Sequence, residues 1–451
     1  MFENFTNREG TTGILILGLT MSGKPIMKWQ PLPSAPARHG ARGLMLQPQA
    51  FSGRRLPELD ALRGLMLVGM ALTHLPTRAS YYSNQMFGFV SWAEGFVLVS
   101  ALLSGRVYGA ILRQKSIQVV RERLWLRCAK LYGYHLALLA VAFTVVAEIA
   151  VHTREPALQG LLDFYLAHHA VAVASSMLLL YCPPLLDILP MYIVFLLLTP
   201  LLLNVGRRRG WKFVLIPSAL LWLAAQFHVR DLVYSFLTGH AHFPVPLRNL
   251  GAFNLLAWQF LWVFGLWAGS GGSTRLMDWF RSRWTITLSV IVALTFFVLR
   301  YQLIPYFVAH PADQGGAWVL YDKWQLGAFR LLNFAALGVL FCVLRPYVRR
   351  RLAWTPLVLM GKSSLEVFCV HVLLCFGALS LVGDGSASPW AYQLAIVAVM
   401  LLGMYGVAYL LARPKTEFAL APSMVALQSA SGQPVALAGL AYRSKPARHR
   451  L

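Results

Sequence analysis

Apolar residues form long runs along most of this chain, and short groups of polar and charged residues separate one run from the next. Because an α-helix rises about 1.5 Å per residue, about 20 apolar residues cross the hydrocarbon core of a bilayer. Ten runs approach or exceed this length, and they lie at residues 60–76, 87–111, 131–151, 185–205, 212–228, 252–270, 285–304, 326–344, 356–381 and 390–411. The pattern predicts an all-α integral membrane protein, a bundle of about ten transmembrane helices.

The two ends of the chain differ from this central region. Residues 1–52 mix Pro, Ser, Gly and Arg around one apolar run, Gly13 to Met21, which is too short to span a bilayer. Residues 413–451 are also mixed, and basic residues gather near their end. We therefore expect a mobile cytoplasmic leader (1–52), a transmembrane domain (53–412) and a basic cytoplasmic tail (413–451).

The loops between the runs alternate in charge. One set carries 19 cations, at positions 54, 55, 113, 115, 121, 123, 127, 130, 207, 208, 209, 212, 275, 281, 283, 345, 349, 350 and 351. The other set carries five, which are Arg78, Arg154, Arg230, Arg248 and Lys323. Cytoplasmic loops are enriched in Lys and Arg, so the alternation predicts that both termini are cytoplasmic.

Composition excludes several other classes of protein. Hydrophobic residues make up 57% of the chain and charged residues only 13%, about half the share of a soluble protein. The net charge of +23 does not indicate nucleic-acid binding, because the basic residues lie between apolar runs. The five cysteines lack the paired spacing of metal ligands, and we expect no bound metal.

The first run, "LDALRGLMLVGMALTHLP", contains Asp60, Arg63 and His74. On a helix, 11 residues separate Arg63 from His74 and leave an offset of about 20°, so these side chains share one stripe with Asp60. Buried polar groups in membrane helices face the bundle interior or a water-filled cavity. The stripe therefore predicts the wall of a passage from a charged inner end to an imidazole about 21 Å away.

Each residue of this stripe also has a plainer interpretation. Arg63 could belong to the positive collar at the inner surface, and Asp60 could cap the helix N-terminus. His74 precedes Leu-Pro and could lie at the membrane interface at a helix end.

The second run, "FGFVSWAEGFVLVSALLSGRVYG", places Glu94 in apolar surroundings. A carboxylate on a neighbouring helix could orient or charge-stabilise an imidazole. The alternative is an ordinary interhelical pair without a role in chemistry.

Three later runs carry further candidates. "FNLLAWQFLWVFG" contains Asn254, Trp258 and Gln259, "DKWQLGAFRLLNFAALG" contains Lys323, Arg330 and Asn333, and "GKSSLEVFCVHVLL" contains Lys362, Glu366 and His371. The cations of the second stretch suit an anionic group near the outer leaflet, or they anchor lipid headgroups. Lys362 and Glu366 are four residues apart and could pair with each other, whereas His371 is a second candidate imidazole.

Taken in order with "LPMYIVFLLLTP", these stretches resemble the OpgC family of osmoregulated periplasmic glucan synthesis, within the transmembrane acyltransferase superfamily. The resemblance covers residues 56 to 411. It implies a multi-pass O-acyltransferase of the bacterial inner membrane, with cytoplasmic acyl-CoA, typically succinyl-CoA, as donor substrate and a periplasmic glucan as acceptor. The family's catalytic histidine corresponds to His74, and the preceding acid and base correspond to Asp60 and Arg63.

The resemblance also implies an arginine-containing motif on the cytoplasmic side of the third helix. Arg123 and Arg127 are candidates for it, so the site for the CoA phosphates stays open.

In the mechanism that we predict, His74 takes a proton from a sugar hydroxyl and Glu94 stabilises the imidazolium. Asn254, Gln259 or Asn333 could donate to the oxyanion, near Trp258, and Arg330 or Lys323 could hold the succinyl carboxylate. His371 is the alternative base. The sequence does not decide whether a covalent acyl-histidine forms.

Another class of function is also consistent with the sequence. Buried His, Glu and Arg residues are found in proton-coupled transporters and flippases for glycans or organic anions. The absence of an internal repeat weighs against a transporter, and a non-catalytic scaffold is a third class. A homodimer through lipid-facing small residues is compatible with this composition, which does not demand it.

Overall fold

The computed structural model describes residues 4–6, 12–19, 25–31, 56–241, 243–272, 274–310, 316, 318–383 and 388–413. The chain divides into two compact units, Met1–Arg54 and Arg55–Leu451. The predicted basic tail lies outside the described residues beyond Arg413, and so does much of the predicted leader.

The first unit contains a three-stranded antiparallel sheet that the sequence analysis did not predict. Its strands are β1 (Asn4–Thr6), β2 (Thr12–Leu19) and β3 (Pro25–Pro31), in the order β1-β2-β3. In the register of the sheet, Ile14 of β2 lies opposite Asn4 on one side and Gln30 on the other. Residues 13–19 of the apolar run that is too short for a membrane span therefore lie in a strand, which suits their Ile and Leu residues.

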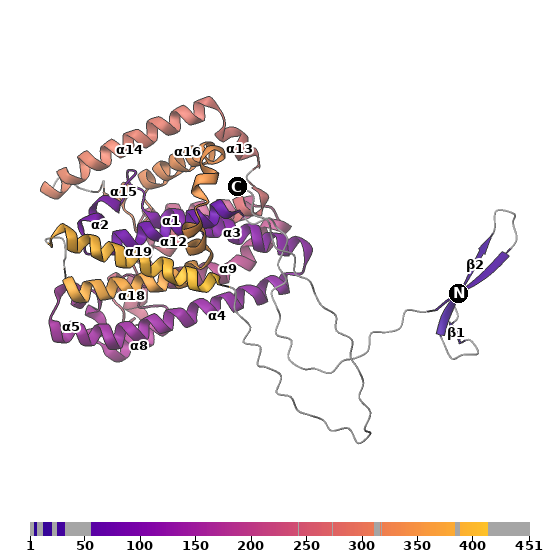
Figure 1. Cartoon of the computed structure of the whole chain (residues 1–451), viewed down its shortest axis with the longest axis horizontal. Helices are drawn as coiled ribbons and strands as arrows, with labels where there is room; N and C mark the ends of the chain where they lie inside the picture. The colour runs from indigo at the N-terminus through magenta and orange to yellow at the C-terminus, as the bar shows by residue number, and fades with distance from the viewer. Residues whose placement is uncertain are drawn as a thin grey trace, which may run out of the picture. The chain divides into compact units, whose positions relative to one another are not determined.

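The second unit is built from helices (Figure 1). In chain order they are α1 (Pro57–His74), α2 (Arg78–Ser83), α3 (Trp92–Gln114), α4 (Ile117–Val141), η1 (Ala142–Val146), α5 (Ala147–Thr153), α6 (Pro156–Leu161), α7 (Asp163–Ala167), α8 (His169–Met177), α9 (Ile188–Arg208), α10 (Lys212–Gln226), α11 (Val229–Ala241), η2 (Leu247–Asn249), α12 (Leu255–Trp267), η3 (Ala268–Gly272), α13 (Thr274–Phe280), α14 (Arg283–Ala309), α15 (Trp318–Tyr321), α16 (Ala328–Leu352), α17 (Thr355–Lys362), α18 (Ser364–Val382) and α19 (Trp390–Ala412).

Seven of the described helices are long and apolar enough to cross a membrane, or eight if the bent pair α10 and α11 forms one span. The protein is therefore an all-helical multi-pass membrane protein in this unit, although the count is lower than the predicted ten. Two predicted spans fall outside the criterion. Helix α1 carries Glu58, Asp60 and Arg63, and α12 has only 13 residues before the π-helical turn η3.

Three predicted spans differ in shape from a single straight helix. The run at 356–381 is divided at Ser363 into α17 and α18. The run at 212–228 is α10, which bends by 73° into α11. The third run belongs to a continuous helix of 37 residues, Ile117–Thr153, in which η1 is a π-helical segment.

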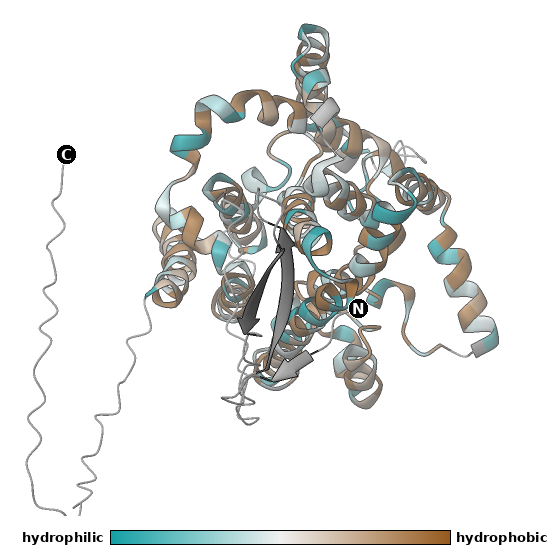
Figure 2. Cartoon of the chain, turned by 90° about the vertical axis from the view of Figure 1, so that its right-hand side faces the viewer, coloured by the Kyte–Doolittle hydropathy of each residue, from teal (hydrophilic) through white to brown (hydrophobic). Residues whose placement is uncertain are grey.

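Large apolar side chains are exposed on the helical unit. Much of the ribbon of its helices has the brown colour of hydrophobic residues (Figure 2). On α14, Leu288 and Leu294 are each 60% exposed, and Leu402 of α19 is 68% exposed. An apolar outer surface of this kind is expected where helices face lipid rather than water.

Helix α1 lies among the other helices and contacts α3, α16, α17, α18 and α19. Two glycines bring its backbone against α17. A Cβ on Gly64 would clash with the carbonyl oxygen of Leu357, and a Cβ on Gly361 would clash with that of Asp60. Small residues permit such close helix packing in membrane proteins. Since α18 begins two residues after α17 ends, this contact also places the start of α18 beside α1.

Candidate active site

Helix α1 positions His74 as its last residue. Pro57 stands at the first turn, where its missing N–H costs nothing, and Glu58 and Asp60 suit the positive end of the helix dipole. Pro76 cannot continue a helix, so the chain leaves α1 directly after the imidazole. The local sequence thus fixes the position of His74 at a helix end.

The imidazole of His74 is paired with that of His371, which lies on α18 and is fully buried. The distance from His74 Nδ1 to His371 Nε2 is 2.9 Å, and the rings stack with centroids 5.2 Å apart. The other ring nitrogen of His371, Nδ1, lies 3.1 Å from the carbonyl oxygen of Phe368. Sequence analysis singled out both histidines but did not predict that they pair.

These contacts determine where the protons are when both rings are neutral. The carbonyl of Phe368 can only accept, so Nδ1 of His371 carries the hydrogen and its Nε2 is an acceptor. His74 must then donate from Nδ1 to His371, which leaves the lone pair on Nε2 of His74. The arrangement prepares His74 Nε2 as a proton acceptor.

His74 lines a cavity of about 320 Å³, which we call the histidine cavity. Polar and charged side chains contribute to its wall, among them Thr73, Ser91, Asp187, Arg248 and Lys323. The Asp187 carboxylate accepts the backbone N–H of Ala252 at 3.2 Å, and Arg248 forms an ion pair with Asp163 at 3.2 Å. Of these, sequence analysis had singled out only Lys323 as a site residue.

A second cavity of about 350 Å³, the arginine cavity, is lined by Arg63. Arg63 donates from Nη2 to Ser364 Oγ, and its guanidinium lies 5.7 Å from the centroid of the Phe96 ring. Further lining residues include the cations Arg127, Lys130 and Lys362. Of the two arginines that sequence analysis named for a cytoplasmic arginine-containing motif, Arg127 lines this cavity and Arg123 does not. The Gly-Lys-Ser-Ser stretch, which contains Lys362 and Ser364, was the signal for it that we did not use.

The two cavities share two lining residues, Ile188 of α9 and Phe368 of α18. Their cations also divide according to the predicted sides of the membrane. Arg127 and Lys130 belong to the strongly basic set of loops, whereas Arg248 and Lys323 belong to the weakly basic set. The cavities therefore lie back to back across a thin apolar wall.

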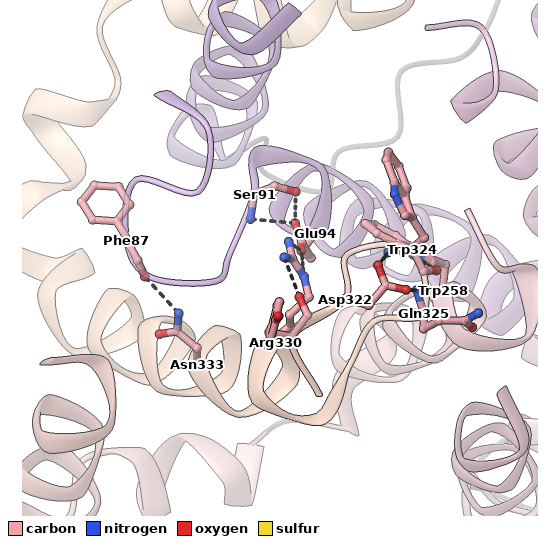
Figure 3. A network of polar contacts seen from close by, with 10 residues as sticks. Phe87, Ser91, Glu94, Trp258, Asp322, Trp324, Gln325, Arg330 and Asn333 are labelled. Carbon is pink, nitrogen blue, oxygen red and sulfur yellow. Dashed lines mark hydrogen bonds and ion pairs between the residues drawn. The ribbon is translucent and has the colours of Figure 1, made fainter. Parts of the chain in front are cut away.

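Glu94 has its hydrogen bonds and its ion pair with Ser91 and Arg330 rather than with His74 or His371. It is fully buried and forms an ion pair with Arg330, whose Nε donates to Glu94 Oε1 at 3.0 Å (Figure 3). Its other oxygen accepts the backbone N–H of Ser91 at 3.0 Å and the Ser91 hydroxyl, which forms a capping box at the start of α3. The interhelical pair that we considered as the plainer alternative is what the structure contains.

The side-chain amides of three candidate oxyanion donors, Asn254, Gln259 and Asn333, donate hydrogen bonds to oxygen atoms of the protein. Asn254 Nδ2 donates to Gln325 Oε1 at 2.6 Å. Asn333 Nδ2 donates to the carbonyl of Phe87 at 3.0 Å (Figure 3). Gln259 Nε2 donates to the carbonyls of Ser218 and Leu256, at 2.8 and 3.0 Å. They line neither of the two cavities, and the same holds for Asp60, Glu94, Trp258 and Arg330.

The expected pairing of Lys362 with Glu366 can be compared with the structure. Glu366 pairs with Lys130 at 2.6 Å rather than with Lys362, because the helix break at Ser363 removes the spacing that would have joined them. Among the described residues, no group of three or more His, Cys, Asp or Glu side chains could hold a metal ion.

Comparison with known proteins gives one match. A family model described as OpgC_C, OpgC protein, matches residues 55–416. No curated protein and no solved structure matches the chain.

Proposed function

We propose, because the chain belongs to the OpgC family, that it is a membrane-embedded O-acyltransferase that moves a succinyl group from acyl-CoA to hydroxyls of glucans. Membership of this family supports an acyltransferase-type role on glucans. The finer parts of the proposal are the donor, the base and the direction across the bacterial inner membrane. The donor enters from the cytoplasm and the glucan from the periplasm.

The observation that carries the proposal is that His74 lines the histidine cavity while its Nδ1 is hydrogen-bonded to His371, an arrangement that assigns the lone pair to Nε2 when both rings are neutral. Acyl transfer to a sugar hydroxyl needs a neutral base at the reacting oxygen, and an imidazole whose tautomer is fixed by a neighbour supplies one. His371 is a positioning residue in this scheme. It takes the orienting role that we had assigned to Glu94.

In the reaction, Nε2 of His74 takes the proton of the glucan hydroxyl as its oxygen attacks the carbonyl carbon of the thioester. The tetrahedral intermediate collapses, the carbon–sulfur bond breaks and the thiolate of CoA leaves. The imidazolium of His74 returns the proton to the sulfur, so an acyl ester and free CoA thiol are formed. His371 holds Nδ1–H of His74 throughout by accepting its hydrogen bond.

The arginine cavity suits the phosphates of the donor. Four cations line it, Arg63, Arg127, Lys130 and Lys362, and guanidinium groups bind phosphate oxygens in pairs. One of them, Lys130, is engaged by Glu366, and Arg63 by Ser364. The acyl arm then passes the wall of Ile188 and Phe368 to reach His74.

A reconstitution experiment tests the proposal. The purified protein is incubated in lipid with radiolabelled succinyl-CoA and linear or cyclic glucan. Acylated glucan and free CoA in equal amounts are expected. Glucan uptake into sealed vesicles without consumption of succinyl-CoA would instead identify a transporter.

A further inference from the structure

The loop that carries Lys323 is built around the carboxylate of Asp322. Its oxygens accept the backbone N–H groups of Trp324 at 3.1 Å and of Gln325 at 3.2 Å. The N–H of Gly327 closes the turn on the carbonyl of Asp322 at 3.0 Å. An aspartate that binds its own following backbone in this way fixes a short turn.

Neighbouring helices hold the same loop from outside. The carbonyl of Trp324 accepts the backbone N–H of Asn254 at 3.1 Å and the indole N–H of Trp258 at 3.2 Å (Figure 3). The carbonyls of the next two residues accept side chains of α10, Gln226 at 2.8 Å and Trp222 at 2.9 Å. Asn254 and Trp258 thus position a loop, although we expected them to contact substrate.

The ammonium of Lys323 ends over the ring of Trp324, 4.5 Å from its centroid, in the loop that these hydrogen bonds hold. It lines the histidine cavity. Within the described part of the chain it makes no hydrogen bond or ion pair, whereas Arg248 of the same cavity is paired with Asp163. The carboxylates of Glu94 and Asp187 act on this ammonium electrostatically, but neither forms an ion pair with it among the described residues. A carboxylate ligand in the cavity would supply the contact partner that this partly buried cation lacks.

We infer that the Lys323 ammonium binds the free carboxylate of the acyl group, and thereby makes transfer selective for donors that end in a carboxylate. This inference rests on the proposed function. It also decides between the two cations that sequence analysis offered for this role. Arg330 is fully buried and engaged by Glu94, so it cannot turn to a substrate without breaking that pair.

A pair of donors of the same chain length tests the inference. Butyryl-CoA has a methyl group where succinyl-CoA has its carboxylate. A site with a fixed charged partner discriminates strongly against an analogue that lacks the matching group. We expect the wild type to prefer succinyl-CoA in kcat/KM by about 100-fold or more, and Lys323→Met to lose that preference. Its rate with butyryl-CoA should change by less than about threefold.

The matched control is Lys212→Met. Lys212 also stacks on the ring of the next residue, Phe213, at 5.2 Å, but it lines neither cavity. It should leave both donors unchanged. Lys323→Arg should keep the succinyl preference, because the guanidinium retains the charge.

The outcomes separate this inference from the proposed function. If the wild type forms no succinyl-glucan, the proposed function fails. If the wild type transfers succinyl and butyryl groups equally well, the function stands and the inference is overturned. An equal fall on both donors in Lys323→Met also overturns it, because Lys323 would then only stabilise its loop.

Discussion

Two buried pairs of side chains join distant parts of this chain, and they differ in whether any hydrogen-bonding group is left without a partner. Glu94 and Arg330 join α3 to α16, and Ser91 and the Tyr321 carbonyl take up the remaining groups. His74 and His371 join α1 to α18, but their chain of hydrogen bonds ends at an unshared lone pair beside a cavity. The fully bonded pair is suited to joining two helices, whereas the pair with an unshared lone pair beside a cavity is suited to proton transfer.

The largest expected effect concerns the histidine pair, His74 and His371. His74→Ala should lower kcat by about 10²- to 10⁴-fold, the usual contribution of a general base. Resistance to unfolding in detergent should stay near that of the wild type, since the ring is at a helix end. The measurement is the rate of CoA release with succinyl-CoA and glucan. An active His74→Ala would move the role of base to His371.

For the ion pair of Glu94 and Arg330, substitution should lower the stability of the protein rather than its catalytic rate alone. Arg330→Met leaves Glu94 buried without its partner and should destabilise the protein by about 3–5 kcal/mol. Adding Glu94→Gln should recover a large part of this loss. Unfolding in mixed micelles measures both. Asp231→Asn is the control, because the exposed pair of Asp231 with His228 should contribute less than about 1 kcal/mol.

A smaller effect sharpens the role of His371 as a positioning residue. His371→Ala removes the acceptor for Nδ1–H of His74 and should lower kcat by about 10- to 100-fold with little change in KM. His371→Gln places an amide oxygen within similar reach and should restore part of the rate. His371→Ala should also change the pH profile of kcat, and His371→Gln should reverse that change. A purely structural role of His371 would not produce this result.

The next prediction extends the comparison to the arginine cavity. Arg127→Ala should raise KM for succinyl-CoA by about tenfold, the effect of one lost charge-assisted bond, and leave KM for glucan unchanged. Arg121→Ala, which is exposed on the same helix and lines neither cavity, serves as the control. A rise in KM for glucan alone would assign the arginine cavity to the acceptor.

The smallest effect is a dependence on pH. Burial lowers the pKa of the Lys323 ammonium below the ordinary value for lysine. The negative charges of Glu94 and Asp187 raise this pKa, and the positive charge of Arg330 lowers it further. A lowered pKa means that the ammonium loses its charge earlier as pH rises. The ratio of succinyl to butyryl transfer should therefore decline in the alkaline range. Lys323→Arg should hold the ratio constant there, because the guanidinium stays charged.

The sequence predicted the helices better than it predicted their partners. The run at 390–411 became α19, Trp390–Ala412, because a continuous apolar stretch has one favourable structure in a membrane. The break at Ser363 was not predicted, because the apolar runs before and after Lys362, Ser363 and Ser364 were read as one span, and α17 packs on α1 in the structure. Among described residues, three strands in residues 4–31 were also missed.

The candidate site was predicted as a set of residues and not as an arrangement. Glu94 was expected beside His74 because the two lie on consecutive spans, whereas it is paired with Arg330, 236 positions later. His371 was a second imidazole by sequence and became the partner of the first through the contact of α1 with α18. A single sequence shows which polar groups enter the membrane, but their pairing follows from tertiary contacts that it does not display.

The apolar wall of Ile188 and Phe368 between the two cavities has a consequence for the cell as well as for the reaction. If the protein lies in an energised membrane, as we propose, a continuous water column through this bundle would let protons leak across it. These two side chains would then be the seal of the membrane, which must let one acyl arm pass and still exclude hydronium. Smaller residues there would be expected to harm the energised membrane before they harm the enzyme.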